Sequence, residues 1–271
     1  MPESFFILSK DYLELASDEI IAISKTYDRF AKAKIISNLI IIQSKTNWNE
    51  IAKRASFVKV SGQILRKMSG LFLDDDNFQV LKNANTFVCR IINLSSKQLN
   101  IPELERSMGD MISKFSHAKV ELVDPDITVY LIFTDEESFF GFSKRVKEES
   151  RPKKTKNHPH ELDWKLTRVM INLTGLKEGE TVCDPFCGTG TTLLEAESMG
   201  IHAIGLDFDE KMYKISKENL KANGYKSKVF KLDFQEFTKI SEKFDGIVTD
   251  LPYGRASKAS EKPEEILKKF F

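Results

Sequence analysis

Hydrophobic and polar residues follow mixed patterns in the first half of the chain. Runs of apolar and β-branched residues alternate with segments whose apolar residues recur at helical spacing. The pattern predicts strands at residues 4–9, 33–43, 86–92, 126–133 and 138–143, and helices at 11–26, 48–55 and 101–115. Such a mixture is typical of α+β modules.

From Leu162 onward the pattern becomes regular, with strands and helices in strict alternation. It predicts strands at residues 181–184, 202–206, 228–232 and 245–249, helices at 162–174, 191–199 and 209–223, and a short helix near 235–241. Strands separated by helices of this length form a parallel sheet that is covered on both faces. We therefore expect an α/β, Rossmann-like domain here, and a further helix is expected at 262–271.

Composition describes a globular protein with more than one domain. The chain has 271 residues, 41% of them hydrophobic, and a formal net charge of +1. A net charge near zero is compatible with a basic patch on one part of the surface. The segment Lys144–His160 holds seven Lys and Arg residues against two Glu, together with two Pro and two His, and we interpret it as an interdomain linker. A solvated loop and a track for nucleic-acid phosphates are both consistent with this composition.

Cysteine usage and the N-terminus favour a cytoplasmic protein. The three cysteines, Cys89, Cys183 and Cys187, lack CxxC spacing, so we expect neither a disulfide framework nor a zinc or other metal site. The N-terminal residues lack the basic and apolar regions of a signal peptide, and the apolar run Leu39–Ile42 is too short to span a bilayer.

Acidic residues at the ends of consecutive predicted strands indicate a cofactor site. Asp184 precedes Gly188-x-Gly190, and Asp207 and Asp233 end the next two strands. The glycines allow a ligand to approach the backbone, and in doubly wound sheets ligands bind at the carboxyl ends of the strands. The chain lacks a third dinucleotide-type glycine and a Gly-Lys-Ser/Thr loop. The spaced acids instead match the ribose and adenine of S-adenosylmethionine (SAM). We expect the cofactor to contact Asp184, Phe186, Gly188, Gly190, Thr191, Asp207, Phe208 and Asp233.

The end of the fourth predicted strand supplies a candidate catalytic site. Asp250 and the Leu251 carbonyl can accept the hydrogens of an exocyclic base amine and orient its nitrogen. Pro252 would fix the turn, and Tyr253 offers a face on which a flipped-out base can stack.

These motifs resemble those of the THUMP-domain class I methyltransferases, in particular the archaeal and eukaryotic tRNA guanine-N2 methyltransferases that modify guanosine 10. Asp184–Gly190 is similar to the family's cofactor motif, Thr249–Arg255 to its catalytic motif, and Asn157-His158-Pro159 to the His-Pro that precedes the methyltransferase domain. Phe87–Ile92 and Val123–Phe142 resemble the strand segments of a THUMP module.

The resemblance implies that successive parts of the chain form modules with different functions. Residues 1–70 would form a ferredoxin-like module, 71–145 a THUMP RNA-binding module, 146–161 the basic linker, and 162–271 the methyltransferase domain. The first two modules would hold tRNA while the last transfers one or two methyl groups to guanine N2. The expected RNA-binding residues are Arg90, Arg151, Lys153, Lys154, Lys156 and His158.

Two departures from the family pattern leave alternatives open. Leu251 stands where proline is commoner, but the position would act through its carbonyl. The predicted methyltransferase sheet also has fewer strands than a complete domain, so the sequence is expected to be C-terminally incomplete, or completed by a partner subunit or by self-association. The alternatives are methylation of ribosomal RNA, a non-catalytic RNA-binding protein, and one subunit of a split enzyme. Methylation of DNA bases is disfavoured by the THUMP-like half, and thiouridine synthesis by the absence of its pyrophosphatase loop.

Overall fold

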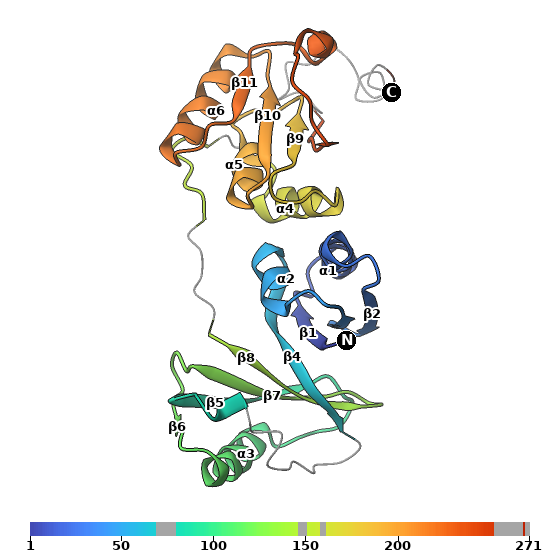
Figure 1. Cartoon of the computed structure of the whole chain (residues 1–271), viewed down its shortest axis with the longest axis vertical. Helices are drawn as coiled ribbons and strands as arrows, with labels where there is room; N and C mark the ends of the chain where they lie inside the picture. Colours follow the sequence, from blue (N-terminus) through green and yellow to red (C-terminus); the bar gives the residue numbers. More distant parts are fainter. Residues whose placement is uncertain (69–79, 146–150, 158–160, 252–267, 269–271) are drawn as a thin grey trace. The chain divides into compact units, whose positions relative to one another are not determined.

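The computed structural model describes residues 1–68, 80–145, 151–157, 161–251 and 268. The chain divides into two compact units (Figure 1). The first comprises residues 1–53 and 57–148, and the second comprises 54–56 and 149–271. Within the described ranges, none of the helices combines the length and the apolar character needed to cross a bilayer.

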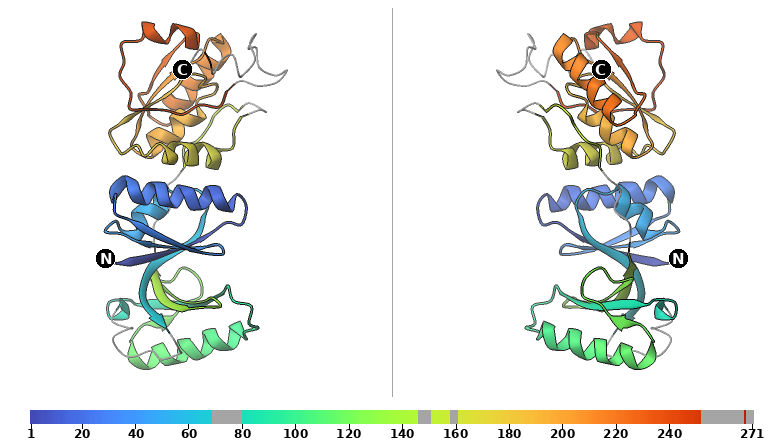
Figure 2. Two further views of the ribbon diagram at one scale, coloured as in Figure 1. Left: turned by 90° about the vertical axis from the view of Figure 1, so that its right-hand side faces the viewer. Right: turned by 90° about the vertical axis from the view of Figure 1, so that its left-hand side faces the viewer.

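The first unit is built on one eight-stranded sheet with the order β2-β3-β1-β4-β8-β7-β5-β6. Its strands are β1 (Glu3–Leu8), β2 (Lys32–Ile36), β3 (Leu39–Gln43), β4 (Val58–Met68), β5 (Thr86–Asn93), β6 (Lys119–Val120), β7 (Ile127–Phe133) and β8 (Ser138–Lys144). The helices of this part of the chain are α1 (Leu13–Tyr27), α2 (Trp48–Arg54) and α3 (Ile101–Phe115). Helix α1, blue in Figure 2, packs on β1 and β3, and α3, green, packs on β5 and β6. The expected α+β character is confirmed.

Strand β4 joins the two halves of this sheet, and it was missed by the sequence pattern. Its first part pairs with β1 and its second part pairs with β8, both antiparallel. Gly62 of β4 lies where the pairing changes partner. A Cβ atom at Gly62 would lie 2.3 Å from the Phe142 carbonyl oxygen and 2.7 Å from the ring of Phe5, which is fully buried. The absence of a side chain at Gly62 therefore allows the strands to approach each other over the core.

We expect Gly62→Ala to destabilise the first unit. The new methyl group would have to displace backbone, and overpacking of this kind costs about 1–3 kcal/mol. Gly109→Ala is the matched control, because a Cβ there meets nothing within 4 Å and the residue lies inside α3. Relieving a helical glycine stabilises by about 0.5–1 kcal/mol. Urea unfolding of both variants measures the two effects, and equal stabilities would contradict this account of the crossing.

The second unit contains a four-stranded parallel sheet with the order β11-β10-β9-β12. Its strands are β9 (Thr181–Asp184), β10 (His202–Leu206), β11 (Lys228–Phe230) and β12 (Gly246–Ile247). Its helices are α4 (Trp164–Leu173), α5 (Thr191–Ser198), α6 (Glu210–Ala222) and the 3₁₀ helix η2 (Phe234–Lys239). The predicted alternation of strands and helices is confirmed, and β9 lies between β10 and β12 in the sheet. The helix predicted at 262–271 lies outside the described residues except for Lys268.

Local sequence explains where the helices of this unit begin. Asp209 caps α6, since its carboxylate accepts hydrogen bonds from the backbone N–H groups of Lys211 at 2.7 Å and Met212 at 3.3 Å. The helix therefore starts at Glu210, directly after the end of β10. Helix α5 follows β9 through the turn that contains the two predicted cofactor glycines. Both helices thus begin at the carboxyl edge of the sheet, where the expected cofactor residues lie.

Candidate functional site

The turn between β9 and α5, residues 184–191, is called the cofactor loop here. It starts at Asp184, whose side chain is only 2% exposed. One carboxylate oxygen accepts hydrogen bonds from the Phe186 backbone N–H at 3.1 Å and from the Thr249 hydroxyl at 2.8 Å. Burial is the main cause that raises the pKa of Asp184 to about 6, while hydrogen bonds from Thr192 and Thr249 oppose the rise. Asp184 thus links the cofactor loop to the segment after β12.

Both glycines of the loop have the left-handed backbone that favours glycine, with φ of 51° at Gly188 and 86° at Gly190. A Cβ atom at Gly190 would lie 3.2 Å from Cβ of Ser216 in α6, whereas a Cβ at Gly188 would meet nothing within 4 Å. Gly190 therefore serves packing against α6, and Gly188 borders open space. The sequence analysis missed Gly205 in β10, where a Cβ would lie 2.9 Å from the Cys187 sulfur.

Asp207 follows β10 and connects it to the cofactor loop. Its carboxylate accepts hydrogen bonds from the backbone N–H groups of Gly188 at 2.9 Å and Asp209 at 2.8 Å, one on each oxygen. These two bonds hold the Asp207 carboxylate, a group that accepts hydrogen bonds, beside the cofactor loop. The neighbouring Phe208 is 44% exposed. Its ring is therefore accessible at the edge of the site.

The third predicted acid and the loop aromatic lie at η2. The Asp233 carboxylate caps η2 by accepting a hydrogen bond from the Gln235 N–H at 2.9 Å. The Phe186 ring packs on Phe234 with ring centroids 5.0 Å apart. Phe234 was not predicted as a site residue, although an aromatic directly after a strand-ending acid is a usable signal. Together, η2 and the cofactor loop line the same region of the carboxyl edge.

Strand β12 carries the predicted catalytic residues toward the cofactor loop. It pairs in parallel with β9, with Ile247 opposite Cys183. Thr249 is anchored on Asp184, and Asp250 follows directly. Desolvation raises the pKa of Asp250 above its ordinary value. Leu251 is half-buried, and the predicted Pro252 and Tyr253 lie outside the described residues.

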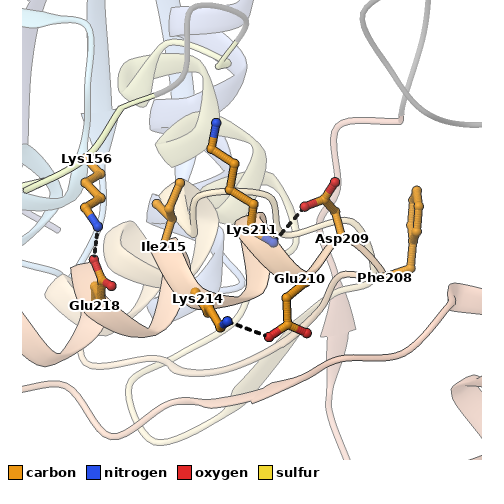
Figure 3. Close-up of a pocket in the computed structure, with 8 residues that line it drawn as sticks. All are labelled: Lys156, Phe208, Asp209, Glu210, Lys211, Lys214, Ile215 and Glu218. Atoms are coloured by element: carbon orange, nitrogen blue, oxygen red, sulfur yellow. Dashed lines mark hydrogen bonds and ion pairs between the residues drawn. The ribbon is translucent and has the colours of Figure 1, made fainter.

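An open cavity of about 770 Å³ lies beside the first half of α6 (Figure 3). Phe208 lines it, whereas no residue of the cofactor loop does. Lys156 and Glu218 form an ion pair at 2.5 Å, and Lys214 pairs with Glu210 at 3.0 Å. Among the described residues that line it, acidic and basic side chains are equally represented.

The predicted RNA-binding residues occupy different environments. Arg90, in the first unit, lies 3.8 Å from the Glu105 carboxylate. Arg151 pairs with the buried Glu195 at 2.5 Å, and its guanidinium lies over the Trp164 ring. Lys153 is exposed, Lys156 pairs with Glu218, and His158 lies outside the described residues.

Lys154 differs from Arg90, Arg151 and Lys156 because its side chain is only 16% exposed, whereas theirs are 38–54% exposed. Its ammonium forms an ion pair with Glu161 and donates hydrogen bonds to the hydroxyls of Thr189 at 3.1 Å and Thr191 at 2.5 Å. Thr191 was predicted to contact the cofactor and opens α5. The ammonium of Lys154 is thus directed at the cofactor loop.

Two asparagines also belong to this region, Asn219 in α6 and Asn223 at its C-cap, and neither was predicted from the sequence. Asn219 is fully buried and bonds the linker and the cofactor loop, and Asn223 bonds the backbone of Lys153. The sequence does offer an indication for Asn219, because it adjoins Leu220 on the core side of a helix and a buried amide must find hydrogen-bond partners.

The buried cysteines are not candidates for nucleophilic chemistry. Burial raises the pKa of the Cys183 thiol to about 12, and that of Cys187 well above its ordinary value. Both therefore stay protonated near neutral pH and act as packing residues. In the part of the chain that the structure describes, no group of three or more His, Cys, Asp or Glu residues could hold a metal ion.

Comparison with solved structures supports the fold. The chain resembles TrmN from Thermus thermophilus, with a TM-score of 0.56 and 19% identity over 94% of this chain and 80% of that one. It also resembles a predicted N6-adenine-specific DNA methylase from Listeria monocytogenes, with a TM-score of 0.50 and 12% identity over 99% and 83% of the two chains. At these identities the similarity shows a shared fold.

Comparison with known sequences shows the family. A family model described as "RMKL-like, methyltransferase domain" (UPF0020) matches residues 151–271. The tRNA (guanine(10)-N2)-dimethyltransferase of Methanothermobacter thermautotrophicus is 30% identical over 282 residues, which cover 99% of this chain and 83% of that protein. Its counterpart in Methanocaldococcus jannaschii is 26% identical, covering 97% and 85%. The human U6 snRNA (guanine-N(2))-methyltransferase THUMPD2 is 30% identical over 66% of this chain and 36% of that protein. The chain belongs to the family of tRNA (guanine(10)-N2)-dimethyltransferases.

Proposed function

We propose that this chain transfers methyl groups from SAM to the exocyclic N2 of guanosine 10 in tRNA. Two relatives that match it over nearly its whole length bear this activity in their names. The structural observation that carries the proposal is the pairing of β12 with β9. This pairing places Asp250 at the same edge of the sheet as the cofactor loop, where a methyl donor and an amine acceptor can meet.

The residues at the carboxyl edge fit SAM. Gly188 borders open space, and the Asp207 carboxylate, which bonds the Gly188 N–H, is an acceptor of the kind that binds ribose hydroxyls. Asp233 can accept from an adenine amine, and the exposed ring of Phe208 can flank the adenine. Burial of Asp184 behind the loop leaves it to act by holding Phe186 and Thr249 in place. When bound, SAM supplies an electrophilic methyl group on a positively charged sulfur.

Asp250 and the Leu251 carbonyl would bind the acceptor amine. An exocyclic amine is a poor nucleophile because its lone pair is delocalised into the ring. Two acceptors that hold its hydrogens turn the nitrogen toward the methyl group and stabilise the positive charge that develops on it. The raised pKa of Asp250 makes its carboxylate a better acceptor for the proton that N2 releases. Tyr253 remains the expected stacking partner for the flipped-out guanine, with Pro252 fixing the turn.

Asp184 holds Asp250 in position through Thr249. The Thr249 hydroxyl donates to the Asp184 carboxylate one residue before Asp250, and the Val248 N–H bonds the Cys183 carbonyl at 3.0 Å. The segment leading into the catalytic motif is therefore fixed against β9 by backbone and side-chain bonds. A buried carboxylate has an unfavourable desolvation energy, so its hydrogen bonds are needed to stabilise it.

We propose that the first unit contacts the tRNA, as the THUMP resemblance implies. The module boundaries at residues 70, 145 and 161 belong to this proposal. In the structure, strands on both sides of residue 70 belong to one sheet, because β4 pairs with β1 and β8. A single sheet offers a continuous support for RNA-binding residues such as Arg90. Arg151, Lys153, Lys156 and His158 are proposed to contact phosphates from the linker.

The acceptor nucleotide is tested directly by methylation of defined transcripts. The protein is incubated with SAM and an unmodified tRNA, and methylated nucleosides are mapped by digestion and mass spectrometry. We expect N2-methylated guanosine at position 10, and no product when guanosine 10 is replaced by adenosine. A U6 snRNA transcript is a matched comparison because one relative acts on that RNA. Methylation of U6 alone would overturn the tRNA assignment, and absence of any product would favour an RNA-binding protein or a subunit of a split enzyme.

We expect Asp250→Asn to lower kcat by about a hundredfold or more, because it removes a charged acceptor that acts in the transition state. SAM affinity should stay near the wild-type value, as measured by calorimetry without tRNA. Asp207→Ala is the contrasting variant and should weaken SAM binding about tenfold or more, given its place between β10 and the cofactor loop. Equal loss of SAM affinity in both variants would rule out the role assigned to Asp250.

We expect the free energy of unfolding of the Asp184→Asn variant, minus that of the wild type, to increase as pH rises. The folded state raises the pKa of this carboxyl from 3.8 to about 6, so folded protein binds more protons than unfolded protein in that window. The wild type therefore loses stability as pH rises through this range, by up to about 3 kcal/mol at this residue. Asparagine does not titrate, so the variant does not lose stability in this way as pH rises. Urea unfolding at pH 4 and pH 8 measures the difference, with Thr249→Val as a control that keeps the carboxyl; a difference independent of pH would contradict the assignment.

A further inference from the structure

The linker residues 153–156, which we call the strap, lie along α6 and are bound to it. Asn223, the C-cap residue of α6, donates a hydrogen bond from its amide to the Lys153 carbonyl at 2.7 Å and accepts one from the Lys153 N–H at 2.8 Å. The Asn223 side chain therefore bonds both the N–H and the carbonyl of Lys153, as the backbone of a paired strand would. This pair fixes the first residue of the strap.

Asn219, one turn earlier on α6, joins the strap to the cofactor loop. Its carbonyl oxygen accepts from the Thr155 N–H at 3.0 Å, the Thr155 hydroxyl at 2.9 Å and the Lys156 N–H at 3.1 Å. Its amide donates to the carbonyls of Lys156 at 3.0 Å and Thr189 at 2.9 Å. Thr189 lies between the two glycines of the loop. One fully buried side chain therefore uses its whole hydrogen-bonding capacity to connect the two segments.

Lys154 adds a second connection between the strap and the cofactor loop. Its ammonium bonds the hydroxyls of Thr189 and Thr191, and the Thr189 hydroxyl donates to the Glu161 carboxylate at 2.7 Å. A cation at the N-terminus of α5 is electrostatically unfavourable with respect to the helix dipole, so Lys154 is poorly suited to stabilising the helix alone. The Glu161 carboxylate offsets this cost and completes a compact polar cluster beneath the loop.

We propose that Lys154 and Asn219 are positioning residues that hold the cofactor loop in the conformation that binds SAM. The inference rests on the proposed function and reassigns Lys154 from RNA binding. Glycines at two positions give the loop conformational freedom, which must be removed when a ligand binds. Bonds from the strap remove part of that freedom in advance. The strap therefore contributes to cofactor affinity, and Lys154 is no longer counted among the linker residues proposed to contact phosphates.

Lys154→Met tests the inference, because it keeps the length of the side chain and removes its charge and donors. We expect the dissociation constant for SAM, measured by calorimetry without RNA, to rise about tenfold, while kcat at saturating SAM stays near wild type. The affinity for tRNA and its salt dependence should not change. Lys153→Met is the matched control: it removes the same charge from an exposed neighbour that bonds Asn223 through its backbone, and its SAM affinity should equal that of wild type.

Asn223→Ala is the second variant, since a substitution at the buried Asn219 could prevent folding. It releases one end of the strap and should weaken SAM binding by a smaller factor, with an unchanged melting temperature of the ligand-free protein. Wild-type SAM affinity in both Lys154→Met and Asn223→Ala would overturn the inference. So would a Lys154→Met variant that binds SAM normally but binds tRNA more weakly with a reduced salt slope, since that result assigns Lys154 to phosphate contact.

Failure of the proposed function would give a different result. If wild-type protein neither binds SAM nor methylates tRNA, the proposed function fails and the role of the strap fails with it. If wild-type protein binds SAM and methylates tRNA, but the strap variants bind SAM as tightly as wild type, the inference about the strap fails alone. The wild-type measurement therefore separates the two cases.

Discussion

The parallel pairing of β9 with β10 on one side and β12 on the other determines the geometry of the second unit. Carboxyl ends of parallel strands meet at one edge of a sheet, so the acids that follow these strands gather there. Asp184 ends β9, Asp207 follows β10 and Asp250 lies shortly after β12. The close approach also depends on Gly205, because a side chain there would contact Cys187 and Leu193. The pairing of β9 with β10 and β12 therefore permits the contacts proposed for Asp207 with the cofactor and for Asp250 with the acceptor base.

Polar bonds, more than apolar packing, fix the segments at this edge. Apolar residues such as Val182 and Leu193 fill the core beneath the sheet, but they do not specify where a loop ends. Hydrogen bonds fix these positions instead. Asp184 holds the segment after β12, Asp207 holds Gly188, and Asn219 holds both Thr189 and the strap. A buried polar group that loses its partner is destabilising by about 1–3 kcal/mol. Each of these side chains thus favours one arrangement of loops over alternatives that would leave it unbonded.

The sequence predicted the second unit well because alternation of strands and helices is a long, regular signal. It failed at β4, whose residues read Lys-Val-Ser-Gly-Gln at the crossing, because burial there is divided between two partner strands and a glycine replaces an apolar side chain. The strand-ending acids were found because each stands at a strand boundary. Asn219 was missed because its partners are backbone groups far along the chain, which single-residue patterns do not register. Roles for these site residues remain predictions until they are measured.

Lys154 illustrates why a run of basic residues does not define a single surface. Neighbouring basic side chains of one segment can have different environments. Lys153 is exposed, whereas Lys154 is largely covered and directed at Thr189 and Thr191. From composition alone, Lys153 and Lys154 would be given the same function. In the structure their side chains have different environments, and Lys154 is the one that is largely covered and paired with the Glu161 carboxylate. A charged segment next to a cofactor loop can thus serve RNA with some residues and the cofactor with others. Both Lys154 and Lys156 pair with an acid, so burial distinguishes them: the Lys154 side chain is 16% exposed and that of Lys156 is 54% exposed.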